Sequence, residues 1–260
     1  MGNEIWGDRS LQDGKTQHFS VGDLHVWLRF RDEEIWIAHG YKGELKGNIK
    51  EDQPPKKVEW VRWANKTISA DLRIQPVFPD LPLVVNSEYS LMVSPDTQIQ
   101  IYTRIPIWIR VSLAKNNYKL TELPTIKLSR TWFGTPTEGE LCYYATTKAR
   151  RDLSRADKKQ HAVTCPILVN NKSPEELNFE HFCFRVERLS IYEYNDEFWA
   201  DETRIVYHGE DLNSDVIMTG KLPEGIQKKQ MVAIPRKEIK KSLATRTFKR
   251  LFEDTQIFGR

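Results

Sequence analysis

The sequence predicts an all-β protein of antiparallel β-sandwich architecture, with two packed sandwich-like units and a basic C-terminal α-helix. Apolar and polar residues alternate along most of the chain, as they do in half-buried strands. Turn-forming segments separate the alternating stretches, and only one segment has a convincing helical pattern. We therefore expect an N-terminal β-sandwich-like unit over residues 1–115, a second β-rich unit over 116–234, and the helix over 235–254.

The N-terminal region begins with a predicted hairpin. The segments Leu24–Phe30 and Glu34–Tyr41 alternate and flank a charged, turn-like gap. The next stretch, Lys42–Lys57, contains two glycines, two prolines and many charges, which is typical of a loop. Three prolines between Gln75 and Val85 require an extended segment, because proline disfavours helix at and before its own position.

The strictest alternation runs from Ile99 to Leu113. These 15 residues exceed the usual strand of about 5–6 residues, and Pro106 has no N–H for a ladder bond, so we expect a break or bend there. The aliphatic face should be core. The opposite face offers either a surface that stacks on a ligand or ordinary packing of arginine stems on aromatic rings. Its candidate binding residues are Tyr102, Arg104, Trp108 and Arg110.

Two further strands are predicted at Glu140–Thr147 and Ala162–Asn170. The polar excursion between them includes Lys148–Lys159, where six basic and two acidic residues give a charge of +4. This excursion and the C-terminal tail are the two basic segments of the chain.

The segment Pro235–Asp254 predicts the helix, because proline suits the first helical position and the following residues favour helix. Its charges can meet phosphates of nucleic acid, an anionic membrane or an acidic partner. Alternatively, the helix lies against the sheets with its basic stems covering apolar surface, which is the favoured interpretation. The basic side chains concerned are Lys237, Lys240, Lys241, Arg246, Lys249 and Arg250.

Composition sets limits on the class of protein. The net charge of +3 does not by itself imply a polyanionic partner, although Lys228–Arg250 carries +8 and the other 237 residues therefore sum to −5. Three cysteines without a CxxC pair argue against a disulfide scaffold and a cysteine-rich zinc site. No apolar run approaches the ~20 residues that span a bilayer, and no signal-peptide pattern is present. We expect a cytoplasmic protein with reduced thiols.

The most distinctive motif is WFGTPTEGELCYY, residues 132–144. Gly134, Pro136 and Gly139 predict a defined loop that leads into a strand. Glu138 and Glu140 are candidates for an acid/base pair, and the nearby aromatic residues for a platform that binds a sugar or base. The alternative, which we favour, is that the motif builds a turn and fills a core. The candidate platform residues are Trp132, Tyr143 and Tyr144.

His181 and Cys183 are the candidate metal ligands, because residues two apart on a strand point the same way. Two ligands do not make a site, and no other cysteine or histidine has ligand-like spacing. The favoured interpretation is therefore a structural one. The five carboxylates between Glu193 and Glu202 lack EF-hand spacing and predict a solvated loop.

Three segments together resemble a known family: IQPVFPDLP (74–82), RTWFGTPTEGELCYY (130–144) and ILVNNKS (167–173). The family is the group of prokaryotic proteins catalogued as domain of unknown function 432, and the resemblance extends from Leu72 to Met218. It implies an all-β protein without an established activity, and it assigns no catalytic residues.

The motifs of nucleotide hydrolases, dinucleotide enzymes and the common serine and zinc hydrolases are missing. We therefore expect a non-enzymatic binding or protein-interaction accessory module without a cofactor. One alternative is a binder or hydrolase of a carbohydrate-like ligand that uses Glu138 and Glu140. A second is electrostatic attachment to nucleic acid or anionic membrane through the basic tail. The partner and the oligomeric state are left open.

Overall fold

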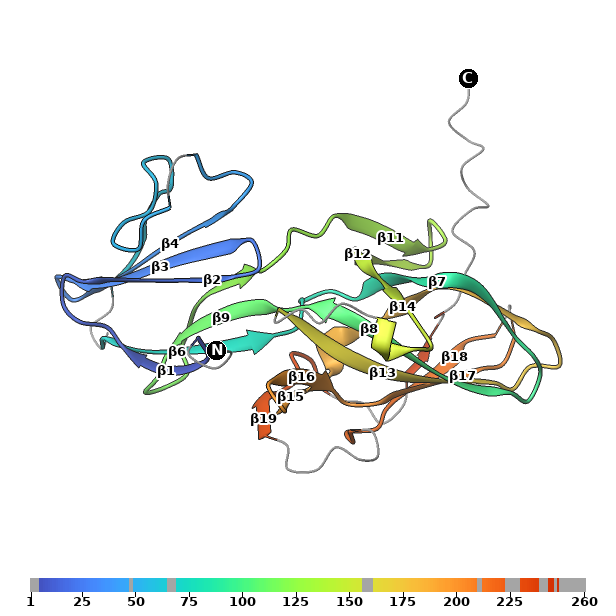
Figure 1. Cartoon of the computed structure of the whole chain (residues 1–260). Coiled ribbons are helices and arrows are strands. Elements are labelled where there is room, and N and C mark those ends of the chain that lie inside the picture. The colour runs from blue at the N-terminus through green and yellow to red at the C-terminus, as the bar shows by residue number, and fades with distance from the viewer. Residues whose placement is uncertain are drawn as a thin grey trace, which may run out of the picture. The chain divides into compact units, whose positions relative to one another are not determined.

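A computed structural model describes residues 5–46, 49–64, 69–155, 161–209, 212–222, 230–238, 243–245 and 247. These residues form twenty β-strands and two 3-10 helices, η1 (Leu153–Arg155) and η2 (Val186–Arg188), and none of them lies in an α-helix (Figure 1). The predicted all-β class is confirmed. Within this part of the chain, no helix has the length and apolar character needed to cross a membrane.

The chain divides into two compact units, each built from separate segments. Unit 1 contains residues 1–77 and 106–127, and unit 2 contains residues 78–105 and 128–260. The predicted division of the sequence into consecutive domains, with boundaries at residues 115 and 234, stays a prediction.

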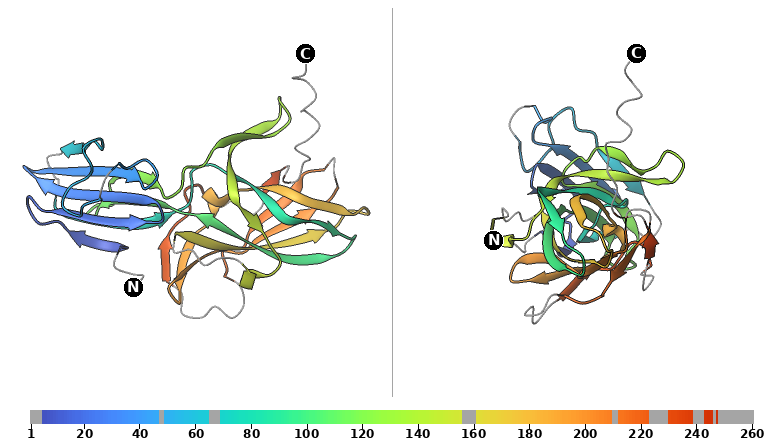
Figure 2. Two further views of the ribbon diagram at one scale, coloured as in Figure 1. Left: turned by 45° about the horizontal axis from the view of Figure 1, so that its top comes forward. Right: turned by 90° about the vertical axis from the view of Figure 1, so that its right-hand side faces the viewer.

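Unit 1 contains two four-stranded sheets. The first has the order β1-β6-β9-β10 and the second β2-β3-β4-β5, whose strands lie side by side in Figures 1 and 2. Buried residues from both sheets, including Leu24, Val26, Ile74 and Ile109, form one hydrophobic core. The strands are β1 (Gly7–Ser10), β2 (Thr16–Val21), β3 (Leu24–Arg31), β4 (Glu34–Tyr41), β5 (Val61–Ala64), β6 (Asp71–Val77), β9 (Trp108–Leu113) and β10 (Lys119–Pro124).

Unit 2 contains a four-stranded sheet and a larger mixed sheet. The smaller has the order β11-β12-β7-β14, and its strands are β7 (Leu83–Val93), β11 (Arg130–Gly134), β12 (Gly139–Ala149) and β14 (Leu177–Phe184). The strands of the larger sheet are β8 (Gln98–Pro106), β13 (Ala162–Asn171), β15 (Ile191–Tyr194), β16 (Glu197–Ala200), β17 (Thr203–Tyr207), β18 (Ser214–Met218), β19 (Gln230–Ala233) and β20 (Leu243–Thr245).

The predicted N-terminal hairpin is confirmed. β3 and β4 pair over their whole length, and Arg31 is opposite Glu34. The two turn residues between them, Asp32 and Glu33, have φ of 52° and 59°, which is the backbone of a tight hairpin turn. The described residues of Lys42–Lys57 form no strand, as expected of a loop.

Pro106 interrupts the long alternating stretch, as predicted. β8 ends at Pro106 and β9 begins at Trp108. The aliphatic residues on both sides are buried, but β8 pairs with β13 of unit 2 whereas β9 lies between β6 and β10 of unit 1. The aliphatic face is core, as predicted, but it is shared between the two units, because the chain passes from unit 2 to unit 1 at this proline.

The sheets are not purely antiparallel, which corrects the prediction. β12 pairs with β7 in parallel, and β13 pairs in parallel with both β16 and β17. The alternation of β14 is also interrupted, because its register shifts between Phe179 and His181. Phe179 and Phe182 lie on the two sides of this shift, and their ring centroids are 5.2 Å apart.

The predicted C-terminal helix is wrong in the part of 235–254 that is described. Residues 235–238 are not helical, and Leu243–Thr245 forms strand β20, which pairs with β18. The backbone N–H groups of Arg236 and Lys237 donate to the carbonyl of Glu187, at 2.9 and 3.0 Å. The pairing of β20 with β18 uses backbone groups that a helix would need, and it overrides the local helix propensity.

The loop of the WFGTPTEGELCYY motif forms the turn between β11 and β12, as predicted. Gly134 has φ of +120°, and a Cβ atom there would lie 2.4 Å from the Glu138 carbonyl oxygen. The turn is closed by a bond from the Thr135 N–H to the Glu138 carbonyl, at 3.1 Å. Position 134 therefore requires glycine for both conformation and space.

We expect Gly134→Ala to lower the free energy of unfolding by about 1–3 kcal/mol, because alanine is strained at this φ and its Cβ meets fixed backbone. Gly43→Ala is the matched control, since a Cβ there has no heavy atom within 4 Å. Urea unfolding of both variants measures the difference. Equal stability of the two would contradict the assignment of this turn.

Candidate binding site

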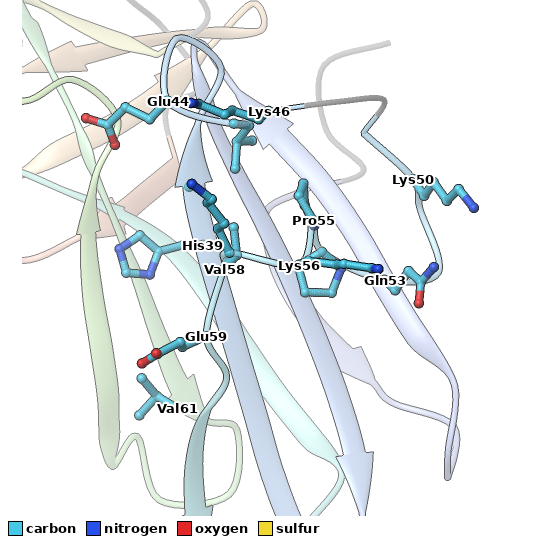
Figure 3. A pocket seen from close by; sticks show the side chains of 14 residues that line it. His39, Glu44, Lys46, Lys50, Gln53, Pro55, Lys56, Val58, Glu59 and Val61 are labelled. Atoms are coloured by element: carbon cyan, nitrogen blue, oxygen red, sulfur yellow. The ribbon is translucent and has the colours of Figure 1, made fainter.

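A groove of about 890 Å³ lies beside strand β4 in unit 1 (Figure 3). β5 pairs only with Glu34–Ile37, the first half of β4. Beyond that point the groove lies between β4 and the loop that joins β4 to β5. Its lining residues are His39, Gly40, Glu44, Leu45, Lys46, Lys50, Gln53, Pro54, Pro55, Lys56, Lys57, Val58, Glu59 and Val61.

The loop forms the far wall of the groove, and side chains on the outer face of the sheet β2-β3-β4-β5, which is the face opposite to the core, hold it in place. The indole N–H of Trp27 donates to the Lys50 carbonyl at 2.9 Å, and Trp27 is completely buried. The guanidinium of Arg29 donates to the Asp52 carbonyl at 3.3 Å and lies 5.0 Å from the centroid of the Trp60 ring. The loop is therefore fixed to the sheet at several points, and the groove is formed before any ligand binds.

Arg29 belongs to a row of side chains that crosses all four strands. The strand register places Thr16 opposite Arg29, Arg29 opposite Trp36, and Trp36 opposite Arg62. Arg29 donates to the Thr16 hydroxyl at 2.6 Å, and the Arg62 guanidinium lies 3.9 Å from the centroid of a Trp36 ring. We name Thr16, Arg29, Trp36 and Arg62 the arginine–tryptophan row. Cation–π contacts of this kind stabilise the outer face by about 0.5–1 kcal/mol each.

The groove has an excess of positive charge. Four exposed lysines line it, against two glutamates. One of the glutamates, Glu44, is paired with Lys127, which lies outside the lining, at 2.5 Å. Burial and the nearby Lys127 lower the pKa of His39, so its ring is neutral at pH 7. Apolar side chains of Leu45, Val58 and the two prolines complete a site suited to an anionic ligand with some apolar surface. The lysines are Lys46, Lys50, Lys56 and Lys57.

Two histidines stack on the same outer face. The rings of His18 and His25 are 5.2 Å apart and nearly parallel, with Nε2 of His18 3.0 Å from Nδ1 of His25. The His18 ring also stacks on Trp27. Burial, followed by the charge of the neighbouring histidine, lowers the pKa of His18, and burial and Lys42 lower the pKa of His25. The pair is therefore neutral at pH 7, and its protonation opposes the packed arrangement.

The candidate binding face of the long alternating stretch is divided between the units. Tyr102 and Arg104 belong to unit 2, whereas Trp108 and Arg110 belong to unit 1. The backbone of Tyr102 bridges to Arg150, and Arg110 pairs with Glu122 at 2.7 Å. The proposal that these four residues form one surface stays a prediction.

Glu138 and Glu140 have different environments. Glu138 is exposed in the turn, whereas the Glu140 carboxylate pairs with the Arg185 guanidinium. The exposed Trp132 donates from its indole N–H to the Thr135 carbonyl at 2.8 Å, and the hydroxyl of Tyr144 accepts from the Asn86 amide at 2.6 Å. The side chains of Glu140, Trp132 and Tyr144 thus have local bonding roles, and the acid/base and platform roles stay predictions.

The candidate metal ligands His181 and Cys183 are both buried in β14. The Cys183 sulfur lies 3.7 Å from the Cys142 sulfur, and all three cysteines are free and buried. The contact with Cys142, together with burial, raises the pKa of the Cys183 thiol, so it remains protonated. No group of three or more metal-ligating side chains occurs in the described residues.

The sequence patterns did not predict a buried cluster of charged side chains in unit 2. Glu187 is 2% exposed and lies near Lys237 and Arg188, with its Oε1 3.5 Å from the Lys237 Nζ. Burial raises the pKa of Glu187 even though these cations act in the opposite direction. Arg185 lies two positions before Glu187 in the sequence. Its guanidinium donates to the carboxylate of Glu140, which is 45 positions away in the sequence. Only the alternation of charge within Arg185–Arg188 signals this cluster in the sequence.

Lys237 is the one predicted tail residue that lies in the described part of the chain, and it belongs to this cluster. The other predicted basic residues lie outside the described residues: Lys240, Lys241, Arg246, Lys249 and Arg250.

A family model matches residues 5–253, nearly the whole chain, and its description is a protein of unknown function, DUF432. The chain belongs to the DUF432 family. The resemblance seen in the sequence motifs is thus confirmed. No curated protein and no solved structure matches the chain.

The first prediction for the site concerns Arg185, whose side chain is 7% exposed and pairs with the Glu140 carboxylate. We expect Glu140→Gln to lower the free energy of unfolding by about 1–3 kcal/mol, because it removes a carboxylate to which this buried cation bonds. Glu176→Gln, at an exposed position of unit 2, should change it by less than about 0.5 kcal/mol. Urea unfolding at pH 7 measures both, and equal effects would refute the role of the pair.

The second prediction concerns how the free energy of unfolding depends on pH. Because the folded-state pKa values of His18 and His25 are lowered, the unfolded chain binds more protons near and below pH 6.5. Stability from this pair is therefore present above pH 6.5 and lost as pH falls through the folded pKa values. The free energy of unfolding should fall more between pH 8 and pH 5 in the wild type than in His18→Gln/His25→Gln. Identical pH profiles would show that the pair does not titrate as described.

Proposed function

We propose that the protein is a non-enzymatic binding module and that the groove beside β4 binds an anionic partner. The observation that supports this most directly is the charge of a preformed groove. Four lysines line a site of about 890 Å³, and one of the two glutamates in it is already paired with Lys127. Such a site attracts anions and is weakened by salt.

The loop anchors support binding rather than a chance arrangement of surface lysines. Trp27 and Arg29 fix the loop backbone at Lys50 and Asp52. A ligand therefore meets lysines carried on an ordered wall, so that less entropy is lost when the complex forms.

Two further predictions from the sequence, the β-sandwich architecture and the cytoplasmic location, are part of this proposal. We propose that unit 1 is a β-sandwich, which its shared core between two sheets supports. We also keep a cytoplasmic location as a proposal, supported by three cysteines that are all free thiols.

The proposal is tested with a fluorescent octaglutamate peptide as the anionic probe. The variant Lys46→Gln/Lys50→Gln/Lys56→Gln/Lys57→Gln should bind it at least about 4-fold more weakly than the wild type, because four exposed charge pairs of about 0.2–1 kcal/mol each contribute about 0.8–4 kcal/mol. Binding of the wild type should also weaken as salt rises, and less steeply in the variant. Fluorescence anisotropy over a range of salt concentrations measures both.

The control variant replaces four exposed lysines outside the groove, Lys15, Lys115, Lys119 and Lys148, with glutamine. It has the same net charge as the groove variant. Equal loss of affinity in the two variants would mean that overall charge is responsible, and the groove would lose its proposed role.

A further inference from the structure

The groove lies where the sheet β2-β3-β4-β5 lacks part of a strand. β4 has eight residues and pairs with β3 over all of them, but β5 has four and pairs only with Glu34–Ile37. No strand in the described ranges pairs with Ala38–Tyr41 on the β5 side. The groove borders this half of β4, with His39 and Gly40 in its lining.

The backbone direction of β4 follows from its bonds to β3. The Lys42 N–H donates to the Asp23 carbonyl at 2.8 Å, which continues the β3–β4 ladder past Tyr41. Because antiparallel bonding alternates, Ala38 and Gly40 direct their N–H and C=O groups toward β3, and His39 and Tyr41 direct theirs toward the β5 side. The Tyr41 carbonyl accepts from the N–H groups of Glu44 and Leu45.

Three β4 backbone groups therefore face the edge that the groove borders: the N–H and C=O of His39 and the N–H of Tyr41. They have the spacing of one repeat of a β-ladder, so a short extended segment can bond to them as a strand would. Continuing the register of β5 would put Lys57–Trp60 opposite Ala38–Tyr41, but these loop residues form no strand. The Val58 N–H donates instead to the Pro55 carbonyl at 2.8 Å, so a turn takes this part of the loop out of the ladder.

We propose that an acidic peptide segment of a partner protein binds in the groove as an added β-strand on the edge of β4. This inference rests on the proposed function, and it names the class of partner and the way it binds. The backbone groups of β4 hold the main chain of the segment, and the four lysines around the groove pair with its carboxylates. The apolar side chains of Leu45, Val58 and Val61 receive the residues between the acidic ones.

Backbone bonding is tested on the protein side at His39. His39→Pro removes the N–H that faces the groove and no N–H that bonds to β3, whereas His39→Ala removes only the side chain. The probe is a fluorescent octapeptide of alternating glutamate and valine. We expect His39→Pro to bind it at least about 10-fold more weakly than the wild type, and His39→Ala to bind it within about threefold.

The same question is tested on the ligand side with wild-type protein, so that the result does not depend on how well His39→Pro folds. An octapeptide of the same sequence with every backbone nitrogen methylated keeps its carboxylates but has no N–H donors. It should bind at least about 10-fold more weakly. Inorganic polyphosphate of similar charge should bind equally to the wild type and to His39→Pro.

The outcomes separate the two proposals. If the methylated and unmethylated peptides bind alike, strand addition is overturned, while an effect of the four-lysine variant still supports an anion-binding groove. If the four-lysine variant binds polyphosphate and both peptides as the wild type does, the groove does not bind anions, and the proposed function fails together with this inference.

Discussion

The hydrogen bond from the Trp27 indole to the Lys50 carbonyl is the contact on which the groove depends. Trp27 projects from the sheet face opposite to the core of unit 1, yet it is completely buried. A buried indole N–H without a partner costs about 1–3 kcal/mol, so the loop that covers Trp27 must also place a carbonyl at this point. The position of the loop, and with it one wall of the groove, is thus set by a residue of β3.

The open edge of β4 has a related cause. The loop returns toward the sheet through a turn, in which the Val58 N–H donates to the Pro55 carbonyl at 2.8 Å. Pairing with β4 begins after this turn, at Val61 opposite Ile37. The length of β5 leaves His39 beyond the paired part of this edge, while Trp60 and Arg29 keep the loop beside it. Anchoring and the turn together produce an open edge with a fixed wall instead of a longer strand.

Much of the fold follows from local pattern, and most of the site does not. The turn at Asp32–Glu33, the break at Pro106 and the glycine requirement at Gly134 could be predicted because each depends on the conformation of a few neighbouring residues.

The errors arise where distant segments meet. The segment after Pro235 has helical propensity, but its backbone is used by Glu187 and β18. In the same way, nothing near Glu140 in the sequence indicates that Arg185 will neutralise it. The groove lysines lie in a stretch that was correctly predicted as a loop. That they line one groove, however, depends on the anchors in β3, each of which bonds to a loop residue 23 positions away.

The lysines have a second consequence for an exposed strand edge. An unpaired edge invites pairing with any extended chain, and positive charges beside it are a common protection against such pairing. A second copy of this groove brings the same charges and is repelled, and a neutral strand gains no ion pairs to offset the desolvation of the lysines. An acidic strand alone satisfies both the backbone groups and the charges. In the proposed complex, the same four side chains would discourage self-association and select the partner, so specificity would come from repulsion as much as from attraction.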